Sequence, residues 1–480
     1  MSSSGGKAPS AANMSPAPPS PDPRMALRAG WFDAGQAIWN LELVSHTNPS
    51  PSFMPTAPGD PRLWQSDLAF TGKYVFQGNF GGYQVWDISN PAKPTLRTAY
   101  VCPGSQSDVS VYHNLLFVSS ESMNSRMDCG LQGVPDTISK ERVRGIRIFD
   151  ITDVAHPRLL TTVQTCRGSH THTVVTDPKD PSTIYVYVSG RAAVRSPQEL
   201  AGCSALLPNV DPNTAYFRIE VIQVPLAHPE QARIVSSPRI FEGLTEPAKH
   251  AELVADSLAA IAARERATAE SLALGRPAPP PPTNQPPGGP SQCHDITVYP
   301  AIGLAAGACG GYGLLLDIRD AAHPKRIAAV ADSNFSFWHS ATFNNSGTKV
   351  LFTDEWGGGT NPRCRVTDKP EWGADAIFTL AGNTMTFRNY YKLPVPQKSV
   401  ENCVAHNGTM IPLPGRDVMV QAWYQGGLSV FDWTDPDHPK EIAYFDRGPM
   451  DSTKLVTGGY WSTYWYNGYI VSSEMSRGLD

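Results

Sequence analysis

One phrase recurs along the chain: an apolar strand that ends in Asp and runs into a turn containing Pro. Copies begin at Tyr83, Ile146, Leu314 and Leu428, and a degenerate copy begins at Ile219. A short apolar segment follows each copy, so each copy predicts two antiparallel strands joined by a Pro-fixed turn. Self-similarity at a regular spacing indicates a repeat architecture.

A second hairpin precedes each phrase and completes a repeat of about 40–45 residues, the length of one propeller blade. Its first strand opens with a small polar residue or His, and its second strand is apolar. Seven such openings occur, at Ser66, Ser107, His172, His294, His339, His406 and Ser462. The sequence therefore predicts an all-β fold, a seven-bladed β-propeller of four-stranded antiparallel blades.

Three parts of the chain are expected. Residues 1–24 are rich in Ser, Pro, Ala and Gly and predict a disordered tail, because they offer too little apolar surface to offset the entropy of ordering. Residues 25–61 are an N-terminal segment in which NLELVSH, from Asn40, is expected to supply the outer strand of the first blade and close the ring. Residues 62–480 form the propeller. The seventh blade would still lack most of one strand at Asp480, so we expect the native polypeptide to continue beyond it.

The largest insertion spans residues 244–291 and combines a helix-prone stretch with a Pro-rich linker. It is either a lid over the central channel or a solvated excursion, since its Ala-rich face is weakly apolar. Smaller insertions at residues 191–215 and 361–386 extend hairpins in the third and fifth blades.

Charge and hydropathy restrict the partners. The net charge of −5 and the lack of a Lys/Arg stripe imply neither nucleic acid nor an anionic membrane. No run of 18 apolar residues predicts a membrane span, and the N-terminus has no apolar segment typical of a signal peptide. A small-molecule substrate remains as the expected partner, and the sequence does not predict the oligomeric state.

The eight cysteines contain no C-x-x-C pair, which argues against a zinc ribbon or a thioredoxin-like motif. Pairing in chain order would close loops of modest length and would suit an oxidising, extracytoplasmic compartment. Eight reduced, buried thiols are the alternative. The pairs in chain order are Cys102 with Cys129, Cys166 with Cys203, Cys293 with Cys309, and Cys364 with Cys403.

Four of the seven aligned openings are histidine, in consecutive blades: His172, His294, His339 and His406. The chain has 12 His in 480 residues, so seven arbitrary positions would hold fewer than one. Inner strands surround a propeller axis, so these imidazoles should converge in the central channel. They predict a transition-metal ion, with Fe or Cu favoured and Zn as a further candidate. His170 is an alternative ligand to His172, and hydrogen bonding between blades is the alternative to a metal.

Three glutamates end the second strand of their blades, which returns to the face where the inner strand begins. They are Glu121, Glu355 and Glu474. We expect them to support the imidazoles by accepting the N–H of the distal nitrogen, or to carry protons.

The phrase YQVWDISNPAKP, from Tyr83, resembles the LVIVD-repeat family of bacterial β-propeller proteins, which are often exported, and the similarity extends from Leu63 to Asp480. It implies an architecture but no reaction. The one-His-per-blade pattern and TDEW, from Thr353, are more distantly similar to the selenium-binding proteins, whose members include a copper-dependent methanethiol oxidase. Four His with three Glu also resemble the metal site of the iron-dependent carotenoid oxygenases, although their sequence pattern is absent.

Two functions are consistent with these features. The first is a metal-dependent oxidoreductase or oxygenase acting on a small molecule, because an all-His ligand set suits redox metals at least as well as zinc. The second is a non-enzymatic exported scaffold that binds protein or polymer through its faces and its long insertion.

Overall fold

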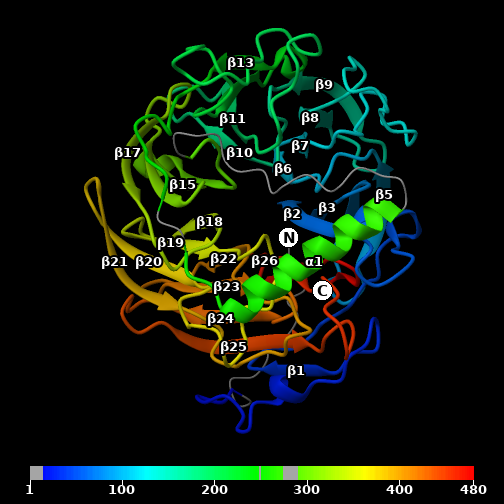
Figure 1. The fold of residues 1–480 in the computed structure, drawn as a ribbon, viewed down its shortest axis with the longest axis vertical. Helices are drawn as coiled ribbons and strands as arrows, with labels where there is room; N and C mark the ends of the chain where they lie inside the picture. Colours follow the sequence, from blue (N-terminus) through cyan, green and yellow to red (C-terminus); the bar gives the residue numbers. More distant parts are fainter. Residues whose placement is uncertain (1–13, 248–249, 274–289) are drawn as a thin grey trace, which may run out of the picture.

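The strands form seven sheets around one axis, so the chain is a seven-bladed β-propeller (Figure 1). The computed structural model describes residues 14–247, 250–273 and 290–480. The first strand of each blade contacts the first strand of the next, and that of the seventh contacts that of the first, so the ring is closed. The predicted fold class, mostly β with one helix, is confirmed.

Each blade is an antiparallel sheet whose strands follow chain order from the axis outward. Blades 1 to 3 are β2 (Gln65–Thr71), β3 (Tyr74–Asn79), β4 (Gly82–Asp87), β5 (Thr95–Val101); β6 (Val109–Tyr112), β7 (Leu115–Ser120), β8 (Gly145–Asp150), β9 (Arg158–Gln164); and β10 (Thr171–Thr176), β11 (Thr183–Ser189), β12 (Glu220–Pro225), β13 (Arg233–Ser236). Blades 4 and 5 are β14 (Ile296–Tyr299), β15 (Leu304–Cys309), β16 (Tyr312–Asp317), β17 (Lys325–Val330); and β18 (Trp338–Phe343), β19 (Lys349–Asp354), β20 (Asp375–Ala381), β21 (Thr384–Tyr391). Blades 6 and 7 are β22 (Gly408–Ile411), β23 (Val418–Ala422), β24 (Leu428–Asp432), β25 (Lys440–Arg447); and β26 (Tyr460–Tyr466), β27 (Tyr469–Glu474), β28 (Gly478–Leu479). Short 3-10 helices lie in the connections: η2 (Pro23–Ala26), η3 (Pro51–Phe53), η4 (Pro61–Leu63), η5 (Pro229–Gln231) and η6 (Pro300–Ile302).

The recurring Asp explains the turn between the third and fourth strands. In blade 1, the Asp87 carboxylate accepts the backbone N–H of Ser89 at 3.0 Å, an Asx turn that reverses the chain. Asp150, Asp317 and Asp432 make the equivalent bond in blades 2, 4 and 6. The repeated phrase is therefore a local turn motif that marks the edge of each of these blades.

Apolar side chains fill the spaces between neighbouring blades. Phe76 of blade 1 packs with Leu116 of blade 2, and Leu68 of blade 1 packs with Val471 of blade 7 across the closing interface. Each blade is buried on both faces by its neighbours, so the core is a ring of interfaces around a polar channel.

The N-terminal strand, β1 (Gln36–Trp39), pairs antiparallel with β25 as a fifth strand of blade 6. The outer strand of blade 1 is β5, and NLELVSH, which follows β1, forms no strand in the described structure. Further along, Thr47 pairs with Leu479 of β28, so the segment also lies against blade 7.

The last residues of the predicted tail contact the propeller. Residues 1–13 lie outside the described residues, but Arg24 is only 1% exposed and forms ion pairs with Asp22 and with Glu441 of β25. An arginine paired in this way fixes the chain before residue 25.

The helix-prone insertion contains α1 (Val254–Ala273), which lies across one face of the propeller (Figure 1). None of its residues is buried. Its start is held by ion pairs of Arg363 with Glu252 and of Arg365 with Asp256. Most of the Pro-rich linker, residues 274–289, lies outside the described residues. In the described part of the chain, no helix has the length and apolar character needed to cross a bilayer.

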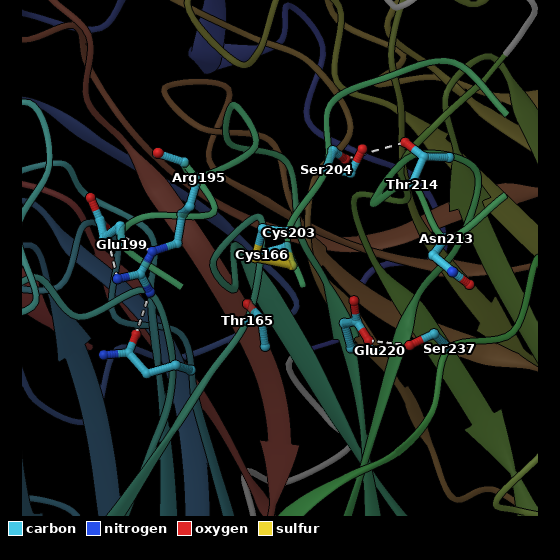
Figure 2. Close-up of a disulfide and its surroundings, with 12 residues drawn as sticks. Thr165, Cys166, Arg195, Glu199, Cys203, Ser204, Asn213, Thr214, Glu220 and Ser237 are labelled. Carbon is cyan, nitrogen blue, oxygen red and sulfur yellow. Dashed lines mark hydrogen bonds and ion pairs between the residues drawn. A yellow bond between two sulfur atoms is a disulfide. The ribbon is translucent and has the colours of Figure 1, made fainter. Parts of the chain in front are cut away.

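All eight cysteines form the four disulfides predicted from chain order. Each joins the segment that enters an inner strand to the end of a second strand or the connection that follows it, so all four lie on one face of the ring. Figure 2 shows Cys166–Cys203 in blade 3, with the Arg195–Glu199 ion pair nearby. Cys364–Cys403 instead links blade 5 to blade 6.

Candidate metal centre

Backbone hydrogen bonds at the start of each inner strand show which residue of one blade corresponds to which residue of the next. In blade 4, the N–H of His294 donates to the carbonyl of Ala308 at 2.8 Å, and the N–H of Ala308 donates back to the carbonyl of Asp295 at 2.9 Å. In blade 6, His406 makes the first of these bonds to Ala422 at 3.0 Å. These two histidines therefore enter the channel at the same height.

In blade 3, His170 makes this bond, to the carbonyl of Ser189 at 3.0 Å. His172 lies two residues further on, opposite Val188. The structure thus places His170, which we had weighed as the alternative ligand, at the position assigned to His172. Residues i and i+2 of a strand point to the same side, so the repeat pattern does not distinguish them.

Blade 7 differs by one residue. In blade 5 the pairing register of the inner strand shifts just after Trp338, beside His339. Blade 7 has the same shift between Tyr460 and Ser462, so Trp461 is the residue that corresponds to His339. The ring therefore presents Trp461, rather than Ser462, beside the histidines.

Four imidazoles form a continuous cluster. The ring centroids are 4.5 Å apart for His170 and His294, 4.0 Å for His294 and His339, and 4.1 Å for His339 and His406. The Nε2 atoms of His170 and His294 are 2.8 Å apart. Three of the four predicted ligands thus lie together, with His170 as the fourth.

Carboxylates lie beside this cluster. Glu355 Oε2 is 3.7 Å from His339 Nε2, and Glu355 Oε1 is 3.6 Å from His406 Nε2. Asp295 Oδ1 is 3.2 Å from His294 Nδ1. Donor atoms of His339, Glu355 and His406 all lie within 4.8 Å of one another, as do those of His294, Asp295 and His339. Either set is compact enough to surround one cation.

Glu121 fixes the orientation of His170. Its Oε1 atom lies within hydrogen-bond distance of His170 Nδ1, so Nδ1–H donates to the carboxylate and Nε2 faces the other imidazoles. Burial opposes ionisation of Glu121, but His170, Arg191 and Arg144 together hold the pKa of Glu121 below its usual value. A carboxylate behind an imidazole is a common arrangement for a metal-binding histidine.

The remaining imidazoles are buried and neutral. The Nδ1–H of His406 donates to the carbonyl of Trp461, which leaves Nε2 without a hydrogen-bond partner among the described residues. Burial lowers the pKa of His406 to about 4 and the pKa values of His294 and His339 well below their usual value. Neutral imidazole is the form that binds metals.

Glu355 has a second partner, which sequence reasoning missed. The hydroxyl of Tyr424 donates to Glu355 Oε1 at 2.5 Å, and its ring centroid is 4.6 Å from that of His406. Tyr424 adopts the left-handed conformation, with φ of 52°, which is rare for a bulky residue. Burial raises the pKa of Glu355 to about 8, so this carboxyl holds a proton at neutral pH.

Two predicted site residues lie elsewhere. His172 is buried against Ser119, with Nδ1 at 2.8 Å from the hydroxyl. Glu474 forms an ion pair with Arg477 at 3.2 Å and accepts the N–H of Gly459, which makes it part of a buried turn. His172 Nε2 is buried without a hydrogen-bond partner among the described residues, and His172 lines the channel cavity.

The central channel also contains a cavity of about 150 Å³. Asp67, Asp108 and Asp295, each one residue after the equivalent position in its blade, contribute to its polar lining. Asp295 therefore lies both in the cavity wall and beside His294.

Comparisons with known proteins identify the repeat. The LVIVD repeat matches residues 65–101, which form the four strands of blade 1. No curated protein matches the chain, and nothing supports a relationship to the selenium-binding proteins.

Three solved structures illustrate the similarities found. A periplasmic gluconolactonase from Pseudomonas aeruginosa is 10% identical over 85% of this chain and 87% of its own, with a TM-score of 0.47. Hydrazine synthase from Kuenenia stuttgartiensis is 10% identical over 89% of this chain and 96% of its own, with a TM-score of 0.47. A putative 6-phosphogluconolactonase from Bacteroides uniformis is 10% identical over 85% of this chain and 87% of its own, with a TM-score of 0.45.

Proposed function

We propose that this propeller binds one transition-metal ion, Fe or Cu in preference to Zn, and is a metal-dependent oxidoreductase or oxygenase for a small molecule. The candidate ligands are His170, His294, His339 and His406, of which His339 and His406 lie with Glu355 in a set compact enough to surround one ion. The observation that carries this proposal is that four imidazoles from four consecutive blades lie in a row, each next to the following one.

The donor chemistry fits such an ion. Two nitrogens bound side by side to one ion at about 2.0–2.1 Å lie about 3 Å from each other, close to the 2.8 Å between the Nε2 atoms of His170 and His294. His339 Nδ1 and His406 Nε2 are buried and lack hydrogen-bond partners among the described residues. Such atoms are costly to bury unless a ligand satisfies them.

The bound ion would supply one-electron redox and oxygen chemistry. The protein's own residues would orient the site and move protons. Glu121 holds the His170 ring, and Tyr424 holds the Glu355 carboxyl. Glu355 lies beside the imidazoles of His339 and His406, so it is placed to carry a proton to or from the site.

The four disulfides support an extracytoplasmic location, since such bonds persist in oxidising compartments. The same location suits a second function, an exported scaffold. The observation that favours a scaffold is α1, which leaves Val254, Leu258 and Ile261 at least 56% exposed. An apolar stripe of this kind is typical of a protein-binding surface.

Metal analysis of the purified protein tests the first function. We expect about one ion per chain, with an absorption or paramagnetic resonance signal if it is Fe or Cu. His339→Ala should lower the metal content. His323→Ala is the matched control, because the His323 side chain is 61% exposed in an outer turn and, among the described residues, hydrogen-bonds Asp320 alone. Equal metal content in both variants, or none in the wild type, would leave the scaffold as the function.

A further inference from the structure

Three arginines surround the His170 side of the cluster. Arg191 Nη1 lies 3.1 Å from His170 Nε2, and Arg144 Nε donates to the backbone carbonyl of Glu121 at 3.1 Å. Arg167 is buried and donates to neutral oxygens, among them the carbonyl of Ala192 at 3.0 Å. In the part of the chain that the structure describes, no carboxylate oxygen lies within 4.0 Å of these three guanidinium groups.

This side of the site therefore carries excess positive charge. Glu121 does not neutralise these arginines by contact, because its carboxylate bonds His170 and Arg144 donates only to its backbone carbonyl. Burial lowers the pKa of Arg167 to about 10, and the charges of Arg144 and Arg191 act in the same direction. Positive charges in a partly desolvated site are costly unless an anion compensates them.

Arg191 is the member of this group that a ligand can reach. It is half-buried, and its Nε and Nη2 atoms make no hydrogen bond to any described residue. The guanidinium carbon lies 4.9 Å from the ring centroid of Phe337, and that ring is 5.4 Å from the ring of His294. A free, planar guanidinium edge beside an aromatic face fits a carboxylate on a flat or apolar body.

We propose that Arg191 binds the carboxylate of an anionic substrate, with Phe337 packed against the substrate body and the imidazole cluster next to both. Arg144 and Arg167 add attraction without contacting the substrate. The chemistry done on that substrate rests on the proposed metal centre, whereas its binding does not.

Benzoate is the test ligand, benzamide its uncharged counterpart and sulfate a non-planar anion. Binding is measured by calorimetric titration, with the protein as purified and after chelator treatment. Wild type should bind benzoate at least tenfold more tightly than benzamide or sulfate in both preparations, because charge-assisted bidentate bonds are strong. Arg191→Gln should lose at least tenfold in benzoate affinity, and Arg191→Lys should lose less, because it keeps the charge but not the planar fork.

The control is Arg319→Gln, which removes an exposed arginine paired with Asp317 and should bind benzoate like wild type. The inference is overturned if wild type binds no benzoate, if benzamide or sulfate binds as well, or if Arg191→Gln binds as wild type does. Metal analysis separates the two proposals. Bound metal without benzoate binding refutes this inference alone, and Arg191-dependent benzoate binding without metal refutes the metal centre alone.

Discussion

Replacing His170 and His172 with Ala, one at a time, separates the metal-binding position from its neighbour two residues away. His170→Ala removes the imidazole that links Glu121 to His294. Loss of a residue that merely supports a metal ligand costs about 10–100-fold in affinity, so loss of the ligand itself should cost at least about 100-fold. That corresponds to about 2.8 kcal/mol at about 1.4 kcal/mol per factor of ten.

His172→Ala should act on stability instead. The imidazole of His172 is completely buried and bonded to Ser119 at 2.8 Å, so removing it should cost about 1–3 kcal/mol of unfolding free energy. Competition with a chelator of known affinity measures the metal, and urea denaturation of metal-free protein measures the stability. If His172→Ala loses the metal while His170→Ala keeps it, the assignment of the fourth ligand is refuted.

Three further predictions concern the carboxylates and one disulfide. Burial raises the pKa of Glu355 to about 8, so its stabilising contribution is complete below about pH 4.5 and is lost as pH rises to about 8. Glu355→Gln in metal-free protein should therefore gain stability relative to wild type over that range, by on the order of 5 kcal/mol in urea denaturation; a difference between the two proteins that does not change with pH would contradict the shift. Glu474→Gln should leave metal content unchanged but lower stability by about 3 kcal/mol, because Arg477 stays buried without its partner; loss of metal would place Glu474 in the site after all. Replacing both Cys364 and Cys403 with Ala should cost about 2–4 kcal/mol in urea denaturation, because a constraint between residues 39 apart is removed; unchanged stability would show that this bond constrains little.

The blades were predictable from sequence because their turn chemistry is local. Asp87 and its counterparts accept an N–H two residues away, and such a motif is visible in any copy of the repeat. The partner of β1 was not predictable, since an alternating apolar strand can extend the outer edge of any blade. The choice between His170 and His172 was not predictable either, because their side chains point to the same side of the inner strand. Arg191 escaped notice because it lies after β11, outside the repeat, where spacing carries no information.

The arrangement of the disulfides bears on how the protein would fail under reducing conditions. All four bonds constrain the connections on the face where the inner strands begin, which is also the face of the imidazole cluster. The interfaces between blades depend instead on apolar packing, which a reductant does not touch. Mild reduction should therefore raise amide hydrogen exchange in the connections around the site first, while strands such as β7 and β11 keep their protection. The molecule would then lose its site geometry while remaining a propeller, so its functional lifetime would be set by thiol chemistry and not by global unfolding.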